Sequence, residues 1–271
     1  MSCIADAFGK LKEHRRQGFI PFITAGDPDL QTTHDLIIEL AQVGATLIEL
    51  GVPFTDPMAD GPVIQRASER ALRHGFGLAD VLQTVSLARV QTDVPIILFS
   101  YFNPLLQFGL ERLAREAKAA GIDGVLVTDL APEEAGDFNS VLQANGLDMI
   151  FLIAPTSTDE RLRLVSERAS GFIYAVSRAG ITGAREEMSA EAEKLVRRMR
   201  QFSELPIAVG FGISKAQHVA DVWRYADAAV VGSAIVNIIE NAADSANAIT
   251  RVREFAAGLI DKNYYSTRLR D

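Results

Sequence analysis

Two acidic residues, Glu49 and Asp60, stand at either end of a proline-containing stretch of the chain. Glu49 belongs to an apolar run that ends at Leu50, where a buried carboxylate is costly unless it is paired, neutralised or used in chemistry. No Arg or Lys lies near Glu49 in the sequence. Two acids at the exit of a single strand are able to form a proton-transfer pair, so this segment indicates catalysis.

The direction of the Glu49 side chain follows from the alternation of side chains along a strand. Ile48 and Leu50 suit the side that faces helices, so Glu49 is expected to point to the other side, into the interior. Apolar surroundings there would raise the pKa of Glu49 and let it exchange protons near neutrality. The alternative is a structural acid that is held by backbone N–H groups or by an Arg.

Asp60 lies between Ala59 and Gly61, just before Pro62. An Asp that precedes a proline in the first helical turn is a frequent N-cap. The same position, in the loop after the strand of Glu49, also suits a catalytic acid. The spacing alone leaves the two interpretations open.

The elements that must position these residues are short apolar runs separated by longer amphipathic segments. Each run is nearly continuous in Ile, Val, Leu, Phe and Ala, which is typical of a strand that is buried on both faces. The predicted strands are Phe19–Thr24, Ala45–Leu50, Pro95–Ser100, Gly124–Thr128, Met149–Ile153, Gly171–Val176, Pro206–Val209 and Ala226–Val231.

Helical patterns fill the intervals between the predicted strands, and Ser233 is a possible N-cap of the helix after the last one. Gly44, Gly121 and Gly146 stand where C-terminal caps are expected. The predicted helices are Leu30–Val43, Pro62–His74, Leu78–Val90, Leu110–Ala120, Pro132–Asn145, Thr158–Ala169, Ser189–Phe202, Ser214–Tyr225 and Ala234–Glu240. The segment Cys3–Gln17 precedes the first strand, and Ala243–Asp261 continues the chain after the last of these helices.

Eight strand-and-helix units predict a single α/β domain over residues 1–271, a (β/α)₈ TIM barrel with an extra N-terminal helix. The alternative is a doubly wound open sheet. That fold would require a glycine-rich nucleotide turn after the first strand, and Thr24–Pro28 is not one. In a barrel, the loops after the strands carry the chemistry.

Three of these loops suggest a ligand site. The turns Gly210–Ser214 and Gly232–Ala234 follow the last two strands, where barrels often bind phosphate through backbone N–H groups at a helix N-terminus. The long loop Ser177–Glu187 is a candidate lid, or else a solvated connector. Tyr174, near the end of the strand before that loop, either brings its hydroxyl into the barrel mouth or simply packs.

Composition narrows the classes of protein and the kinds of chemistry that remain. The chain is 48% hydrophobic with a net charge of −8, which excludes a disordered protein and disfavours nonspecific nucleic-acid binding. No membrane span or secretory signal is evident, and Cys3 is the only cysteine, so a cytoplasmic protein is expected. None of the six lysines lies in a predicted strand and the four histidines are unclustered, which leaves proton transfer by carboxylates.

Several segments, in order along nearly the whole chain, resemble the signature of the tryptophan synthase α subunit family. They are Pro21–Pro28, Leu47–Gln65, Ser177–Gly183, Gly210–Ile213 and Gly232–Val236. The resemblance implies cleavage of indole-3-glycerol phosphate to indole and glyceraldehyde 3-phosphate, a retro-aldol reaction that uses no metal or organic cofactor in this chain.

The resemblance also implies roles at the reacting centre. Glu49 would move protons at indole C3 and at the glyceryl hydroxyl, and Asp60 would bond the indole N–H and stabilise positive charge on the ring. Tyr174 would support the glycerol end. Phe22 and Phe99 are the expected walls of the indole pocket.

At the other end of the substrate, the resemblance implies a lid and a phosphate site. Thr182 would touch Asp60 when the lid closes. The residues expected around the phosphate are Gly183, Phe211, Gly212, Gly232 and Ser233. No role for the tail Tyr264–Asp271 follows from the resemblance.

The family partner is a β subunit that carries pyridoxal phosphate, receives indole and forms tryptophan in an α2β2 heterotetramer. The resemblance implies that Pro53–Pro57 and the Asn103–Pro104 turn face this partner. The competing hypotheses are a standalone indole-3-glycerol phosphate lyase, another phosphate-binding barrel such as an isomerase of amino-acid biosynthesis, and a non-catalytic regulatory subunit.

Overall fold

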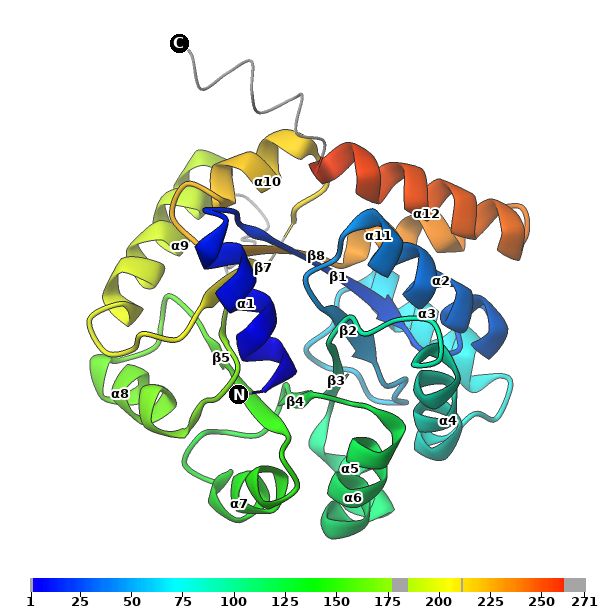
Figure 1. The fold of residues 1–271 in the computed structure, drawn as a ribbon, viewed down its shortest axis with the longest axis horizontal. Coiled ribbons are helices and arrows are strands. Elements are labelled where there is room, and N and C mark those ends of the chain that lie inside the picture. Colours follow the sequence, from blue (N-terminus) through cyan, green and yellow to red (C-terminus); the bar gives the residue numbers. More distant parts are fainter. Residues whose placement is uncertain (1, 177–184, 211, 261–271) are drawn as a thin grey trace.

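A closed barrel of parallel strands forms the centre of the molecule (Figure 1). The computed structural model describes residues 2–176, 185–210 and 212–260. Within these ranges eight strands pair in chain order, and the last pairs with the first. Their bounds are β1 Gly18–Thr24, β2 Ile48–Gly51, β3 Ile96–Ser100, β4 Gly124–Val127, β5 Asp148–Ile153, β6 Ile173–Val176, β7 Ile207–Gly210 and β8 Ala228–Val231.

The strands are buried on both faces, which explains their continuous apolar sequences. Ile48 and Leu50 belong to the large cluster between the strands and the outer helices. Leu47, Ile97 and Tyr174 belong to a second cluster that fills the barrel interior. The alternation along β2 therefore separates the two cores as the sequence predicts.

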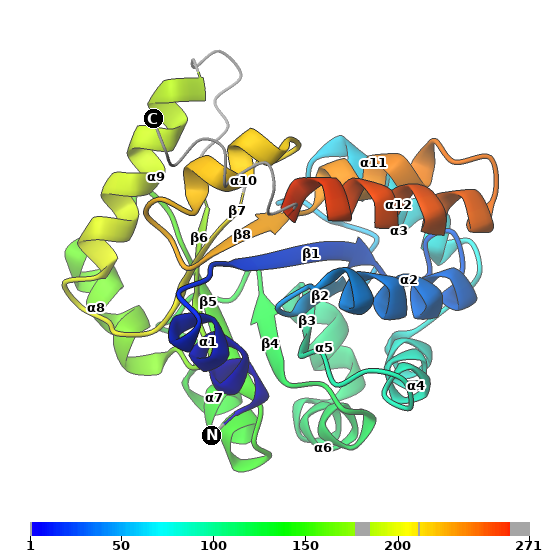
Figure 2. The same ribbon diagram turned by 45° about the horizontal axis from the view of Figure 1, so that its top comes forward.

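Helices surround the barrel, and Figure 2 shows them lying outside the strands. Each connection between consecutive parallel strands contains at least one helix, as a parallel pairing requires. The helix bounds are α1 Cys3–Glu13, α2 Leu30–Val43, α3 Pro62–Leu72, α4 Leu78–Ala88, α5 Phe102–Phe108, α6 Leu110–Ala120, α7 Gly136–Ala144, α8 Asp159–Arg168, α9 Arg185–Met199, α10 Ala216–Val222, α11 Ser233–Glu240 and α12 Ser245–Ile260.

The N-terminal helix α1 covers one end of the barrel (Figure 1). Its Ile4 and Phe8 side chains are buried in the interior cluster, and the Phe8 ring lies 5.8 Å from the ring of Phe172. Because α1 occupies the end where the strands begin, the interior opens towards the other end, where the strands finish. That is the end at which barrels carry their chemistry.

Some predicted boundaries are wrong. Helix α5 was not predicted, α7 begins at Gly136 instead of Pro132, and α9 begins at Arg185 instead of Ser189. Ser233 is the first residue of α11, and its N-cap is Gly232. The predicted C-terminal glycines are confirmed, because Gly44, Gly121 and Gly146 all have positive φ angles. Among the described residues, no helix combines the length and apolar character that a membrane crossing needs.

Candidate functional site

Glu49 is fully buried inside the barrel, as the sequence predicts. It follows Leu47 of the interior cluster at the strand period of two, and it pairs in register with Phe22 of β1 and Ile97 of β3. Neither carboxylate oxygen has a hydrogen-bond partner among the described residues. Burial therefore raises the pKa of Glu49 well above its ordinary value, so the structural alternative, an acid held by N–H groups or an Arg, is wrong for the described part of the chain.

The Tyr174 side chain is buried in the same interior, where the charge of Glu49 acts on its hydroxyl. Burial and the neighbouring Glu49 raise the pKa of Tyr174 well above its ordinary value, so the phenol keeps its proton. The space for this ring comes from Gly210 at the end of β7, where a Cβ atom would lie 2.0 Å from the Tyr174 hydroxyl. The structure thus shows Tyr174 buried in the barrel interior, and its role in the site stays a prediction.

Phe22 and Phe99 come together beside Glu49. Their ring centroids are 5.3 Å apart in an edge-to-face arrangement, and the Phe99 ring lies 6.4 Å from that of Tyr174. Gly51 leaves room for Phe22, since a Cβ there would lie 2.5 Å from the end of the ring. These aromatic faces form an apolar wall that suits a planar aromatic ligand.

Asp60 lies in the connection between β2 and α3, and it is not the cap of that helix. The N-cap of α3 is Gly61, which leaves the Asp60 carboxylate available for other contacts. Burial raises the pKa of Asp60 to about 6, while the interaction with the Tyr101 hydroxyl lowers it. The capping interpretation is therefore wrong.

A small cavity of about 10 Å³, roughly the space of one water molecule, connects Asp60 with the aromatic wall. Two buried hydroxyl residues line it: Ser68 is buried there, and the buried hydroxyl of Thr24 has no hydrogen-bond partner within the described ranges. The lining residues are Phe22, Thr24, Gly51, Val52, Asp60, Ile64, Ser68, Phe99 and Tyr101. Asp60, Phe22 and Phe99 are thus brought together as predicted, whereas Thr24, Ser68 and Tyr101 were not predicted.

The loop that carries Asp60 is fixed by hydrogen bonds. The Ala59 N–H donates to the Tyr101 hydroxyl at 2.9 Å, and the Asp60 N–H donates to the carbonyl of Pro57 at 3.0 Å. The Gln65 side-chain amide donates to the Asp60 carbonyl at 2.9 Å. Asp60 is therefore held by its own loop, by α3 and by the end of β3.

The candidate phosphate region lies at the ends of β7 and β8, which pair with each other. Gly212 has a φ of +64°, a conformation that favours glycine, and Gly232 and Ser233 form the start of α11. The first N–H groups of a helix have no intrahelical acceptors, so the start of α11 presents donors to an anion. Gly232 also borders Phe22, with a Cβ position 3.5 Å from that side chain, which joins this region to the aromatic wall.

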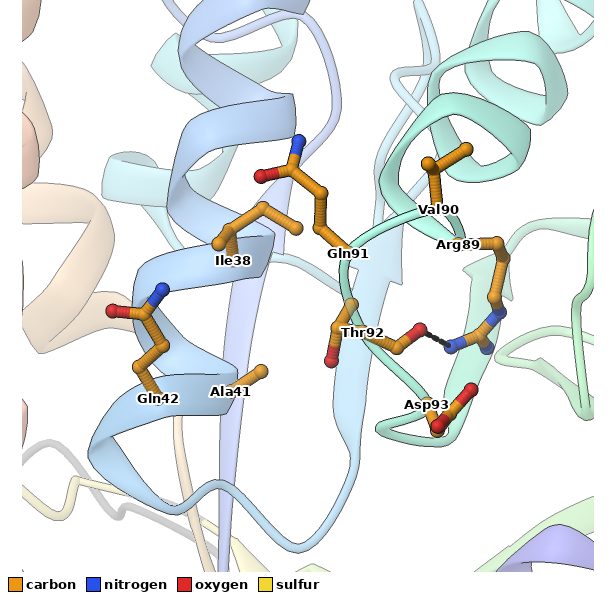
Figure 3. A pocket seen from close by; sticks show the side chains of 8 residues that line it. All are labelled: Ile38, Ala41, Gln42, Arg89, Val90, Gln91, Thr92 and Asp93. Atoms are coloured by element: carbon orange, nitrogen blue, oxygen red, sulfur yellow. Dashed lines mark hydrogen bonds between the residues drawn. The ribbon is translucent and has the colours of Figure 1, made fainter.

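Three predicted site residues, Thr182, Gly183 and Phe211, lie outside the described residues. Among the residues that are described, no three His, Cys, Asp or Glu side chains meet in a way that would hold a metal ion. A separate cleft of about 370 Å³ lies at the opposite end of the barrel, between α2 and the connection from α4 to β3 (Figure 3). Arg89 beside it is committed to the Gly121 carbonyl and to Asp123.

The site therefore combines a buried acid that has no partner among the described residues, a second acid with a raised pKa, an aromatic wall and the start of a helix. A family model described as tryptophan synthase alpha chain matches residues 8–263. The chain belongs to the tryptophan synthase alpha chain family. Named relatives agree: the tryptophan synthase alpha chain of Solibacter usitatus is 49% identical over 259 residues, covering 96% of this chain and 97% of that protein.

Other members of the tryptophan synthase alpha chain family are similar in sequence and in structure. The protein from Geobacter sulfurreducens is 51% identical and covers 89% of this chain and 91% of its own length. The crystal structure of the subunit from Legionella pneumophila has a TM-score of 0.88, 38% identity and coverage of 96% of this chain and 97% of that one.

A structure of the α2β2 complex from Pyrococcus furiosus contains a chain of the same family with a TM-score of 0.84. It is 40% identical and covers 90% of this chain and 97% of that one. These solved structures share the closed eight-stranded barrel, so the predicted fold class is confirmed.

Proposed function

We propose that Glu49, Asp60 and Tyr174 carry the reaction of the tryptophan synthase alpha chain family in this protein, the cleavage of indole-3-glycerol phosphate to indole and glyceraldehyde 3-phosphate. The observation that carries the proposal is the Glu49 carboxyl, which is fully buried and unpaired within the described residues and whose charge acts on the protonated Tyr174. A carboxyl of this kind keeps its proton towards neutrality and is able to donate it.

In the proposed reaction a proton from Glu49 adds to C3 of the indole ring, and positive charge develops on the ring nitrogen. The ionised Asp60 carboxylate stabilises that charge through the indole N–H. The bond between C3 and the glyceryl carbon then breaks, and its electrons return to the ring. The hydroxyl on the departing carbon loses its proton to the Glu49 carboxylate, which forms the aldehyde and restores the acid.

The remaining residues position the substrate. Phe22 and Phe99 would stack on the indole, and the Tyr174 hydroxyl would support the glycerol portion. The start of α11 at Gly232 and Ser233, with Gly212, would bind the phosphate through N–H groups. We extend the phosphate site to Gly183 and Phe211, and the lid contact with Asp60 to Thr182, on the family resemblance alone.

The partner in this proposal is a tryptophan synthase β subunit, and the assembly is an α2β2 heterotetramer in the cytoplasm. Organic cofactor chemistry, which uses pyridoxal phosphate, would belong to that partner. The proposed interface with the β subunit includes Pro53–Pro57. A groove of about 1050 Å³ that is lined by Phe54, Pro57 and Met58 supports this placement. Met58 is 85% exposed, and exposed apolar surface is typical of a protein contact.

An activity assay with indole-3-glycerol phosphate tests the proposal. The purified chain, with and without a β subunit, should release indole, and the β subunit should stimulate the release strongly. Strong release by the isolated chain without stimulation would favour the standalone lyase. The absence of indole under both conditions, from a chain that is folded by circular dichroism, would contradict the proposed function.

A further inference from the structure

Tyr101 connects Asp60 to the rest of the molecule. It follows β3, it is the N-cap of α5, and only 4% of it is exposed. It lines both the small internal cavity beside Asp60 and the large outer groove beside Met58. Its hydroxyl accepts the Ala59 N–H at 2.9 Å, one residue before Asp60.

The position of the Tyr101 ring is fixed from several directions. The next residue, Phe102, donates its N–H to Asp129 at 2.7 Å, which anchors the start of α5. The ring itself packs against Phe54, with centroids 5.2 Å apart. A phenol that is held in this way has a defined oxygen position. Because the oxygen accepts the Ala59 N–H, the hydroxyl hydrogen remains free to be donated to a neighbouring acceptor.

We propose that Tyr101 is a positioning residue, whose hydroxyl binds the Ala59 N–H and donates to the Asp60 carboxylate, and so holds that carboxylate ionised and oriented towards the indole N–H. The inference rests on the proposed role of Asp60. Tyr101 acts through Asp60 and touches no reacting atom.

The charges around the pair fit this role. Burial and the charge of Asp60 raise the pKa of Tyr101 to about 12, so the phenol remains a donor. Asp129, from the end of β4, adds to this effect. On the outer side Asp56, Glu69 and Arg73 line the same groove as Tyr101. The interaction with Tyr101 lowers the pKa of Asp60 against the effect of burial, in the direction that the proposed hydrogen bond requires.

The test is the acidic limb of the kcat/KM profile for indole-3-glycerol phosphate in the complex with a β subunit. In Tyr101→Phe the ring and its contact with Phe54 remain, but the donor is lost. The limb should move to higher pH by about one pH unit, because a hydrogen bond to the charged form lowers the pKa of a carboxyl. Tyr225→Phe, at the opposite end of the barrel between α10 and β8, is the matched control and should leave the limb in place.

A second variant keeps the fold intact and shifts the profile the other way. Replacement of Tyr101 by 3-fluorotyrosine makes the phenol a stronger donor, so the limb should move to lower pH. A ¹³C titration of the Asp60 carboxyl, which needs no activity, should move in the same directions. An unchanged limb and an unchanged Asp60 titration in both variants would overturn the role of Tyr101.

These outcomes separate the inference from the proposed function. If wild-type enzyme releases no indole, or if Asp60→Asn is fully active, the proposed function fails. If wild-type enzyme is active and Asp60→Asn is impaired, but the Tyr101 variants keep the wild-type limb, only the role of Tyr101 fails.

Discussion

Two carboxyl groups at the exits of neighbouring strands show how a partner changes the role of a buried acid. Asp27, after β1, is 1% exposed and forms two hydrogen bonds with Arg70, at 2.7 and 2.8 Å. Glu49, in β2, is fully buried and has no partner among the described residues. Both side chains are almost completely shielded from solvent. The difference between them is that Asp27 has a charged partner that offsets the cost of burial.

The interactions that shift the pKa values of Asp27 and Glu49 show the same contrast. Burial raises the pKa of Asp27, while the hydrogen bonds and the charge of Arg70 lower it. Among the described groups, burial is the one cause that shifts the pKa of Glu49, and it raises it. Asp27, which is paired with Arg70, links the loop after β1 to α3 and stabilises the fold. Glu49, which has no such partner among the described residues, holds a proton that it is able to give to a substrate.

The largest expected effect is on activity. Glu49→Gln keeps the shape of the side chain but removes its proton exchange, so kcat should fall by about 10³-fold. Binding of indole-3-glycerol phosphate should remain measurable by calorimetry. Glu116→Gln, an exposed partner of Arg112, is the control and should be fully active. Normal turnover by Glu49→Gln would remove the distinction between the two acids.

The paired acid should show the opposite behaviour. Asp27→Asn leaves the Arg70 guanidinium with an incomplete set of charged partners, and the free energy of unfolding should fall by about 3 kcal/mol. The control is Asp159→Asn, whose exposed pair with Arg198 should contribute less than about 1 kcal/mol. Urea denaturation measures both. An Asp27→Asn protein as stable as wild type would mean that the ion pair with Arg70 does not stabilise the fold.

The space that Gly210 leaves for Tyr174 should matter next. In Gly210→Ala the new methyl group would overlap the Tyr174 hydroxyl, so the ring must shift from its observed position in the interior. We expect a loss of about 2 kcal/mol in stability from overpacking and a fall in kcat/KM. Gly258→Ala, in α12 with nothing within 4 Å, is the control and should stabilise slightly. Wild-type kcat/KM in Gly210→Ala would show that Tyr174 is not needed where it stands.

The last effect, and the smallest for each pH unit, is the pH dependence of stability. Because the folded-state pKa of Glu49 lies above the unfolded value, the native state holds more protons, and its contribution to stability is lost as the pH rises from about 4.5 towards the folded pKa. Relative to wild type, Glu49→Gln should become more stable by at most about 1.4 kcal/mol per pH unit across that window. Parallel urea series that stay equally spaced from pH 5 to about pH 7 would contradict this sign.

The sequence predicted the strands well because each run is apolar on both faces, a signal that is local. It missed α5, since Phe102–Phe108 is short and contains Pro104, which does not suit a helix interior. The start of α9 was placed too late, at Ser189, because a serine N-cap signal is common and weak. That the chain is one domain over residues 1–271 stays a prediction.

At the site, Glu49 was predictable because an acid in an apolar strand contradicts its surroundings. Tyr101, Thr24 and Ser68 were not, since each approaches Asp60 only through the closure of the barrel and the packing of α3. The only local sign was a tyrosine at the end of β3, and such a residue is often simply packed. Residue type identified the acids, and the fold identified what surrounds them.

The most direct test of the account is a ¹³C NMR titration of the Glu49 carboxyl, assigned by comparison with Glu49→Gln. The account predicts a pKa well above the ordinary value of 4.5, so that the carboxyl keeps its proton as the pH approaches neutrality. A carboxyl that titrates at or below the ordinary value would mean that Glu49 has a partner in solution, and it would contradict the central claim.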